Sequence, residues 1–175
     1  MKIVVTGPES SGKTALTLAL AQALNSPFVP EFARYYLLHL GRPYQQDDLR
    51  NIGRGQRIWE DRGKQNHPQK YLICDTDWTV LHIWETWKYK TATAWQQGYG
   101  PPVPADLYLL CAPDFPWQPD PLRENPDDRE ELFHWYEKLL SDHPLNYCVL
   151  KGPLEARLLT AMLAVESLSK SIKQS

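Results

Sequence analysis

The sequence predicts an α/β fold in which a five-stranded parallel sheet is covered by helices on both faces. Five short, mostly apolar runs alternate along the 175-residue chain with longer stretches of helical spacing. Runs that are apolar at nearly every position are typical of parallel strands buried on both faces. The composition agrees, because 42% hydrophobic and 23% charged residues are usual for a folded domain.

The first four elements follow from short-range patterns. Residues 2–6 (KIVVT) form a β-branched run that stops at a glycine, which predicts a buried strand. Residues 13–24 are strong helix formers, and residues 26–30 (SPFVP) form a second apolar run bounded by prolines. Residues 31–41 predict a helix that Gly41 closes.

The middle of the chain contains two helices around the third strand. Residues 47–66 are polar with a few regularly spaced apolar positions, which predicts an exposed helix weakened by Gly53 and Gly55. Residues 70–75 (KYLICD) predict the third buried strand. Residues 79–90 (TVLHIWETWKYK) predict an aromatic-rich helix.

The last third of the chain completes the alternation. Residues 106–111 (DLYLLC) predict the fourth strand, whereas residues 113–126 hold too many prolines for a helix or a central strand. Residues 129–140 carry an apolar stripe at helical spacing. The fifth strand is expected at residues 146–152 and a closing helix at residues 154–168.

Charge and hydropathy exclude several classes of partner. Nineteen Lys and Arg against twenty-one Asp and Glu give a net charge of −2, so no overall basic field exists to hold a nucleic acid. The apolar runs are far shorter than the roughly 20 residues of a membrane span, and the N-terminus does not resemble a signal peptide. We therefore expect a cytoplasmic protein with one domain over residues 1–168 and a frayed tail over 169–175. The oligomeric state stays open.

Residues 7–14 (GPESSGKT) match the phosphate-binding motif GxxxxGK[ST] between the first strand and the first helix. Its glycines let the backbone wrap around a phosphate, while loop amides and the helix N-terminus supply positive potential. Lys13 is expected to reach the β- and γ-phosphates of ATP, and the Thr14 hydroxyl to bind Mg²⁺. The motif therefore predicts a P-loop NTPase fold. The expected nucleotide-binding residues are Gly7, Glu9, Ser10, Ser11, Gly12, Lys13 and Thr14.

Acidic residues follow two other predicted strands. Asp75 ends the third strand, where a carboxylate holds Mg²⁺ directly or through water. Asp77 is a second candidate, or it could cap the helix that begins near Trp78. Glu31 follows the second strand, where P-loop kinases of small molecules place the acceptor hydroxyl, and Arg34 points the same way. The alternative for Glu31 and Arg34 is a surface ion pair. The candidate substrate-binding residues are Glu31, Arg34, Asp75, Asp77 and Trp78.

The proline-rich segment after the fourth strand carries two arginines. We expect residues 113–129 to form a lid over the nucleotide, in which Arg123 and Arg129 neutralise charge that develops during phosphoryl transfer. We favour Arg123, because Arg129 opens the next helix and could pair there with Glu130 or Glu131. The alternative is a solvated connection.

Five segments resemble the ribosylnicotinamide kinase domain of NadR-type proteins, namely GPESSGKT, VPEFARYYL, CDTDWTVLHIW, DLYLLCAPDFPWQPDPLREN and YCVLKGPLEARL. The resemblance runs over residues 2–160. It implies a nucleoside-kinase-like fold that uses ATP and Mg²⁺ to phosphorylate the ribose 5′-hydroxyl of nicotinamide riboside, giving nicotinamide mononucleotide. The alternatives are a P-loop ATPase coupled to a protein partner and a kinase of another nucleoside. The expected catalytic residues are Lys13, Glu31, Asp75, Arg123 and Arg129.

Overall fold

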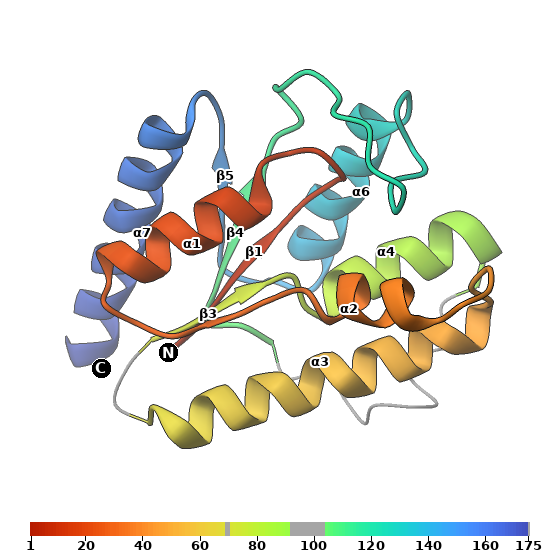
Figure 1. The fold of residues 1–175 in the computed structure, drawn as a ribbon. Coiled ribbons are helices and arrows are strands. Elements are labelled where there is room, and N and C mark those ends of the chain that lie inside the picture. The colour runs from red at the N-terminus through yellow and green to blue at the C-terminus, as the bar shows by residue number, and fades with distance from the viewer. Residues whose placement is uncertain (69–70, 92–103, 175) are drawn as a thin grey trace.

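The computed structural model describes residues 1–68, 71–91 and 104–174 and contains the predicted α/β fold (Figure 1). Five parallel strands form one sheet in the order β2-β3-β1-β4-β5. The strands are β1 (Lys2–Thr6), β2 (Phe28–Val29), β3 (Leu72–Asp75), β4 (Leu107–Cys111) and β5 (Tyr147–Leu150). The helices are α1 (Lys13–Ala23), α2 (Phe32–His39), α3 (Gln46–Asn66), α4 (Trp78–Tyr89), α6 (Arg129–Asp142) and α7 (Leu154–Gln174). Among the described residues, no helix is long and apolar enough to cross a membrane.

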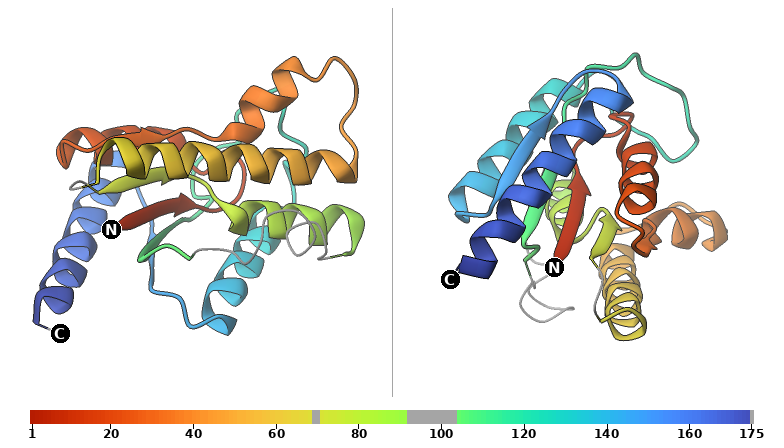
Figure 2. Two further views of the ribbon diagram at one scale, coloured as in Figure 1. Left: turned by 90° about the horizontal axis from the view of Figure 1, so that it is seen from below. Right: turned by 90° about the vertical axis from the view of Figure 1, so that its left-hand side faces the viewer.

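The two faces of the sheet are covered by different helices. Val4 of β1 belongs to the core under α4 and α6, whereas its neighbours Ile3 and Val5 belong to the core under α1 and α7. This alternation is the period of a strand that is buried on both faces. Figure 2 shows the resulting layers, with α7 and α1 on one side of the sheet and α6 and α4 on the other.

Helix α7 contradicts the prediction of a frayed tail. It continues to Gln174, so residues 169–174 are helical, while Ser175 lies outside the described residues. Polar side chains support this last part of the helix. The Ser169 hydroxyl donates to the Val165 carbonyl at 2.7 Å, and Lys170 pairs with Glu166 one turn earlier at 2.7 Å. Such pairs stabilise a helix that a polar composition alone would leave weak.

Helix α3 also differs from the prediction, because it buries one face against α2 and α4. Gly55 lies in that face rather than being a weak point. A Cβ atom at Gly55 would lie 2.1 Å from Cε1 of Phe32. The Phe32 ring packs edge-on against Trp59, with the ring centroids 4.8 Å apart. The missing side chain therefore permits the close approach of α2, the helix that begins directly after Glu31.

We expect Gly55→Ala to lower the free energy of unfolding by about 1–3 kcal/mol, because the new methyl group must displace the Phe32 ring. The helix propensity of Ala, worth about 1 kcal/mol over Gly, works in the opposite direction. Urea unfolding measures the net effect, and the double variant with Phe32→Leu should recover part of the loss. A Gly55→Ala protein as stable as the wild type would contradict this packing role.

Candidate active site

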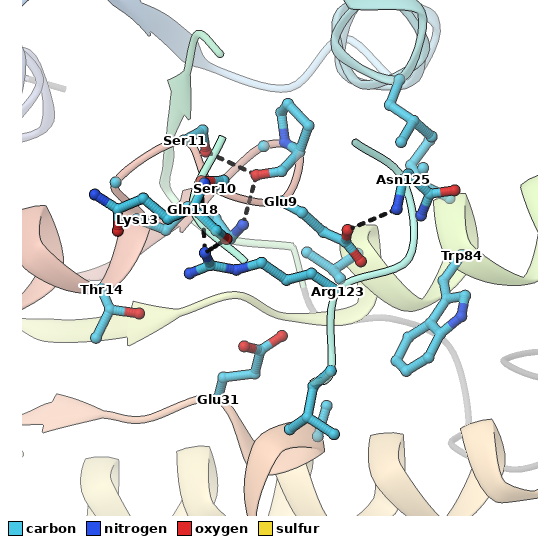
Figure 3. Close-up of a pocket in the computed structure, with 18 of the residues that line it drawn as sticks. Glu9, Ser10, Ser11, Lys13, Thr14, Glu31, Trp84, Gln118, Arg123 and Asn125 are labelled. Atoms are coloured by element: carbon cyan, nitrogen blue, oxygen red, sulfur yellow. Dashed lines mark hydrogen bonds between the residues drawn. The ribbon is translucent and has the colours of Figure 1, made fainter. Parts of the chain in front are cut away.

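The predicted site segments meet at the carboxyl ends of the strands, as open parallel sheets require. β1 leads into the P-loop (residues 7–14), β2 into Glu31, and β4 into the lid (residues 113–129), while Asp75 ends β3. Between them lies a cavity of about 450 Å³ (Figure 3). Residues brought together here are far apart in sequence, and the parallel order of the strands places them at one edge of the sheet.

The P-loop depends on two glycines with positive φ. Gly7 has φ 131°, and a Cβ atom there would lie 2.6 Å from the Cys111 carbonyl oxygen of β4. Gly12 has φ 80° and immediately precedes α1, whose first residue is Lys13. The Lys13 Nζ donates to the Pro8 carbonyl at 2.8 Å. The loop therefore curves in front of a helix N-terminus and carries its lysine at the cavity, which is the arrangement that binds phosphate.

Asp75 lies beside the P-loop as predicted. The Thr14 hydroxyl donates to Asp75 Oδ2 at 2.6 Å, while the buried Oδ1 has no hydrogen-bond partner among the residues that the structure describes. Burial raises the pKa of Asp75, and the Thr14 hydrogen bond and the Lys13 charge oppose that shift.

This pair of residues fits a divalent cation. A buried carboxylate oxygen without a partner, next to a threonine hydroxyl, supplies the hard oxygen ligands that Mg²⁺ prefers. Across the described residues, no group of three or more His, Cys, Asp or Glu side chains could hold a metal ion. The pair Asp75 and Thr14 therefore suits Mg²⁺, which keeps several waters and shares substrate phosphates instead of using a complete protein cage.

Glu31 faces the P-loop across the cavity (Figure 3). Burial raises the pKa of Glu31, the Lys13 charge lowers it, and repulsion from Asp75 raises it further. Arg34, one turn into α2, also lines the cavity, but its guanidinium donates to Asp120 of the lid at 2.7 Å. The ion pair of Arg34 therefore joins α2 to the lid, in contrast to the predicted alternative of a pair with Glu31.

Asp75, Asp77 and Trp78 are predicted substrate-binding residues that are not among the cavity lining, although Asp75 accepts a hydrogen bond from Thr14 of the P-loop. Asp77 caps α4, since its Oδ1 accepts from the Thr79 backbone N–H at 2.9 Å. The Tyr108 hydroxyl donates to Asp77 Oδ2 and accepts from the Trp78 indole N–H, both at 3.1 Å. Thr76 has φ 69°, which turns the chain away from the site directly after Asp75. The capping alternative is therefore correct, and we assign no substrate role to Asp77 or Trp78.

The lid lies over the P-loop and contains no helix or strand before α6, as predicted. Arg123 lines the cavity between the P-loop and Glu31 (Figure 3), and its guanidinium donates to the Gln118 carbonyl. Arg129 does not line the cavity, because it donates to the Phe115 carbonyl at 2.9 Å. Of the two predicted arginines, Arg123 therefore reaches the cavity and Arg129 holds the lid backbone.

Arg157 of α7 is a site residue that the sequence did not reveal. Its side chain is 1% exposed, yet it donates to the Ser11 carbonyl at 2.7 Å and to the Ala112 carbonyl at 2.9 Å. It also donates to the Gly152 carbonyl at 2.7 Å and pairs with Asp114. One guanidinium thus joins the P-loop, the start of the lid and the turn before α7. In the sequence, this arginine looks like any polar position of a helix.

Apolar side chains of α4 form the remaining side of the cavity. Trp84 and Trp87, which we call the aromatic wall, line it together with Val80 and Ile83, and Tyr136 of α6 adds a third ring. The four α4 residues are spaced by three, one and three positions, so they share one helix face. That spacing, in a helix directly after Asp75, was the available signal, but no pattern distinguishes these aromatic residues from the many others in the chain.

The fold has the architecture of P-loop nucleoside and nucleotide kinases. The chain belongs to the AAA domain family, whose model matches residues 2–157. A comparison with curated proteins finds no match to the sequence.

Solved structures with the same fold include three kinds of protein. A NadR protein in complex with NR superposes with a TM-score of 0.80 and 24% identity, over 95% of this chain and 51% of that chain. A thymidylate kinase from Ehrlichia chaffeensis superposes with a TM-score of 0.65 and 16% identity, over 94% of this chain and 98% of that chain. A deoxyadenosine kinase from M. mycoides with bound dATP superposes with a TM-score of 0.62 and 11% identity, over 95% of this chain and 100% of that chain. The chain therefore spans about half the length of the NadR protein, and the expected kinase fold is confirmed.

Proposed function

We propose that the protein is an ATP-dependent kinase that phosphorylates the ribose 5′-hydroxyl of nicotinamide riboside. The observation that carries the proposal is a single cavity with a phosphate loop on one side and Glu31 and the aromatic wall on the other. Phosphate donor and nucleoside acceptor would share this space, which is the proximity that phosphoryl transfer requires. The kinase folds of the structural neighbours support a phosphotransferase.

The donor half of the site would bind ATP. The P-loop amides and Lys13 would hold the β- and γ-phosphates, while Asp75 and Thr14 would hold Mg²⁺. When bound, Mg²⁺ supplies positive charge that neutralises the phosphates. Arg123, which reaches the cavity from the lid, would stabilise charge on the transferred phosphoryl group.

The acceptor half would orient the nucleoside. Glu31 has a raised pKa and faces the P-loop, so its carboxylate would accept a hydrogen bond from the 5′-hydroxyl and take its proton. The rings of Trp84, Trp87 and Tyr136 would contact the base. A nicotinamide ring attached to ribose carries a positive charge, which aromatic faces and nearby carboxylates attract more than they attract a neutral base. The resemblance to NadR-type proteins supports this acceptor.

The direct test is incubation with nicotinamide riboside and MgATP, with chromatographic detection of nicotinamide mononucleotide and ADP. Lys13→Ala should abolish product formation and keep the circular dichroism spectrum, because the Lys13 ammonium donates to the Pro8 carbonyl of the same loop. A panel of other nucleosides is the specificity control. ADP release that neither nicotinamide riboside nor the panel changes would replace this proposal by an ATPase coupled to a protein partner.

Glu31→Gln should lower kcat by roughly 10²–10⁴ with little change in ATP affinity, as expected for loss of a general base. The pKa of Glu31 is raised above its ordinary 4.5, so the wild-type rate should fall with decreasing pH through an apparent pKa above that value. Rate profiles against pH should lack this acid limb in Glu31→Gln. Asp75 also has a raised pKa, and an acid limb that persists in the variant would assign it to Asp75 instead.

Arg123→Ala should lower the single-turnover rate by on the order of 10³ and leave nucleotide affinity nearly unchanged, because the charge it stabilises develops in the transition state. Arg123→Lys should recover only part of the rate, since an ammonium cannot make bidentate contacts. Arg129→Ala is the matched comparison and should lower the single-turnover rate less, because Arg129 contacts the lid backbone. Near-wild-type transfer by Arg123→Ala would reduce the lid to a solvated connection.

A further inference from the structure

Two side chains of the P-loop hold the lid rather than a phosphate. Glu9 Oε2 accepts hydrogen bonds from the backbone N–H groups of Glu124 and Asn125 at 2.9 and 3.1 Å, as Figure 3 shows in part. Ser10 Oγ accepts from the Gln118 N–H at 3.0 Å. The phosphate-binding motif leaves the residue type at positions 9 and 10 open. These contacts are therefore a property of this chain, not of P-loops in general.

The side chains of the same two lid residues reach the aromatic wall. Asn125 Oδ1 accepts from the Trp87 indole N–H at 3.2 Å. The Glu124 carboxylate accepts from the Tyr44 hydroxyl at 2.6 Å, and that hydroxyl accepts from the Trp84 indole N–H at 3.0 Å. Glu124 and Asn125 thus contact the P-loop through their backbone N–H groups. Their side chains connect to the aromatic wall, Asn125 directly and Glu124 through Tyr44.

These hydrogen bonds restrict the orientation of both indole rings. An indole has a single N–H donor, so fixing its partner selects one rotamer among those that packing allows. Tyr44 also packs edge-on against Trp84, with centroids 5.0 Å apart at 72°, and Trp135 packs against Trp87 at 5.2 Å and 81°. If the lid moves away from Glu9, Trp87 loses its partner Asn125, and Tyr44, the partner of Trp84, loses its hydrogen bond to Glu124, so the surface of the cavity changes.

We propose that Glu9 and Asn125 are positioning residues that couple lid closure over the P-loop to the orientation of the aromatic wall. The proposal deepens the kinase function and rests on it for the identity of the acceptor. A nucleoside that stacks on the wall then favours the closed lid, and the closed lid favours bound nucleotide. Because such coupling is reciprocal, each ligand tightens the other by the same factor. The closed lid also holds Arg123 at the cavity, so phosphoryl transfer is favoured when both substrates are present.

Calorimetry of the complete protein tests the coupling through the affinity of MgAMP-PNP with and without saturating nicotinamide riboside. The wild type should show about a tenfold increase in affinity, within the usual range of coupling between sites. Asn125→Leu removes the partner of Trp87 and should reduce the factor to about one, while the affinity for MgAMP-PNP alone changes less than about twofold. Asn125→Asp keeps an acceptor oxygen and should retain most of the factor. Asp127→Asn, an exposed lid position outside the cavity, is the matched control.

Steady-state kinetics separate positioning from a loss of stability. Asn125→Leu should raise the KM for nicotinamide riboside about tenfold and change kcat less than about threefold, whereas partial unfolding would lower kcat alone. Glu9→Ala should reproduce the loss of coupling, and Glu9→Gln, which keeps an acceptor oxygen, should restore part of it. A coupling factor in Asn125→Leu and Glu9→Ala equal to that of the wild type would overturn the proposal.

A spectroscopic experiment needs no acceptor. The indole N–H signals of Trp84 and Trp87, assigned through Trp84→Phe and Trp87→Phe, report the hydrogen bonds directly by NMR. The Glu9 side chain accepts hydrogen bonds from the lid backbone. Glu9→Ala should shift both indole signals and speed their exchange with water at least threefold, and Asp127→Asn should not. Unchanged indole signals in Glu9→Ala would overturn the coupling. If the signals respond as expected but wild-type protein does not phosphorylate nicotinamide riboside, the choice of acceptor fails and the coupling stands.

Discussion

The Arg157 guanidinium is buried between three segments that form the site. Burial of an unpaired charge costs several kcal/mol, and the contacts to the Ser11, Ala112 and Gly152 carbonyls and to Asp114 offset that cost. Since the fork of donors is planar and rigid, it fixes how the P-loop, the first residues of the lid and the turn before α7 lie relative to one another. The Phe115 ring continues this arrangement, because the guanidinium lies over it at 4.4 Å and Gly12 approaches its edge.

The charges in the cavity are balanced locally, so the protein needs no overall basic field. Three cations already have partners: Lys13 contacts the Pro8 carbonyl, Arg34 pairs with Asp120, and Arg123 contacts the Gln118 carbonyl. A phosphate group that enters must replace these partners, and the backbone amides of the P-loop add positive potential that the net charge of −2 does not reveal. Opposite them, burial raises the pKa values of Glu31 and Asp75, and repulsion from Asp75 adds to the shift of Glu31.

Short-range patterns predicted the strands and the P-loop, whereas contacts between distant segments stayed hidden. The apolar runs and GPESSGKT depend on local propensity and backbone sterics, which a sequence displays directly. Gly55 looked like a defect because its reason is the ring of Phe32, a residue of another helix. Asp77 was ambiguous because the positive φ of Thr76 decides which way it points, and threonine rarely adopts that conformation. Arg157 contacts Ser11, which is 146 positions away in the sequence, and no periodic pattern indicates a contact at that separation.

The prolines of the lid explain why its attachment is so specific. Five of residues 113–126 are proline and have no N–H group, so the backbone can donate at only a few places. Five of the nine remaining N–H groups have partners of this kind: Gln118 donates to Ser10, Glu124 and Asn125 donate to Glu9, and Leu122 and Arg123 donate to Asp120. A stiff segment with few donors cannot slide to another register without leaving several of them unpaired. The same residues that make this segment irregular therefore favour one arrangement of its backbone, with Asp120 held next to Arg34 and Asn125 held next to Trp87.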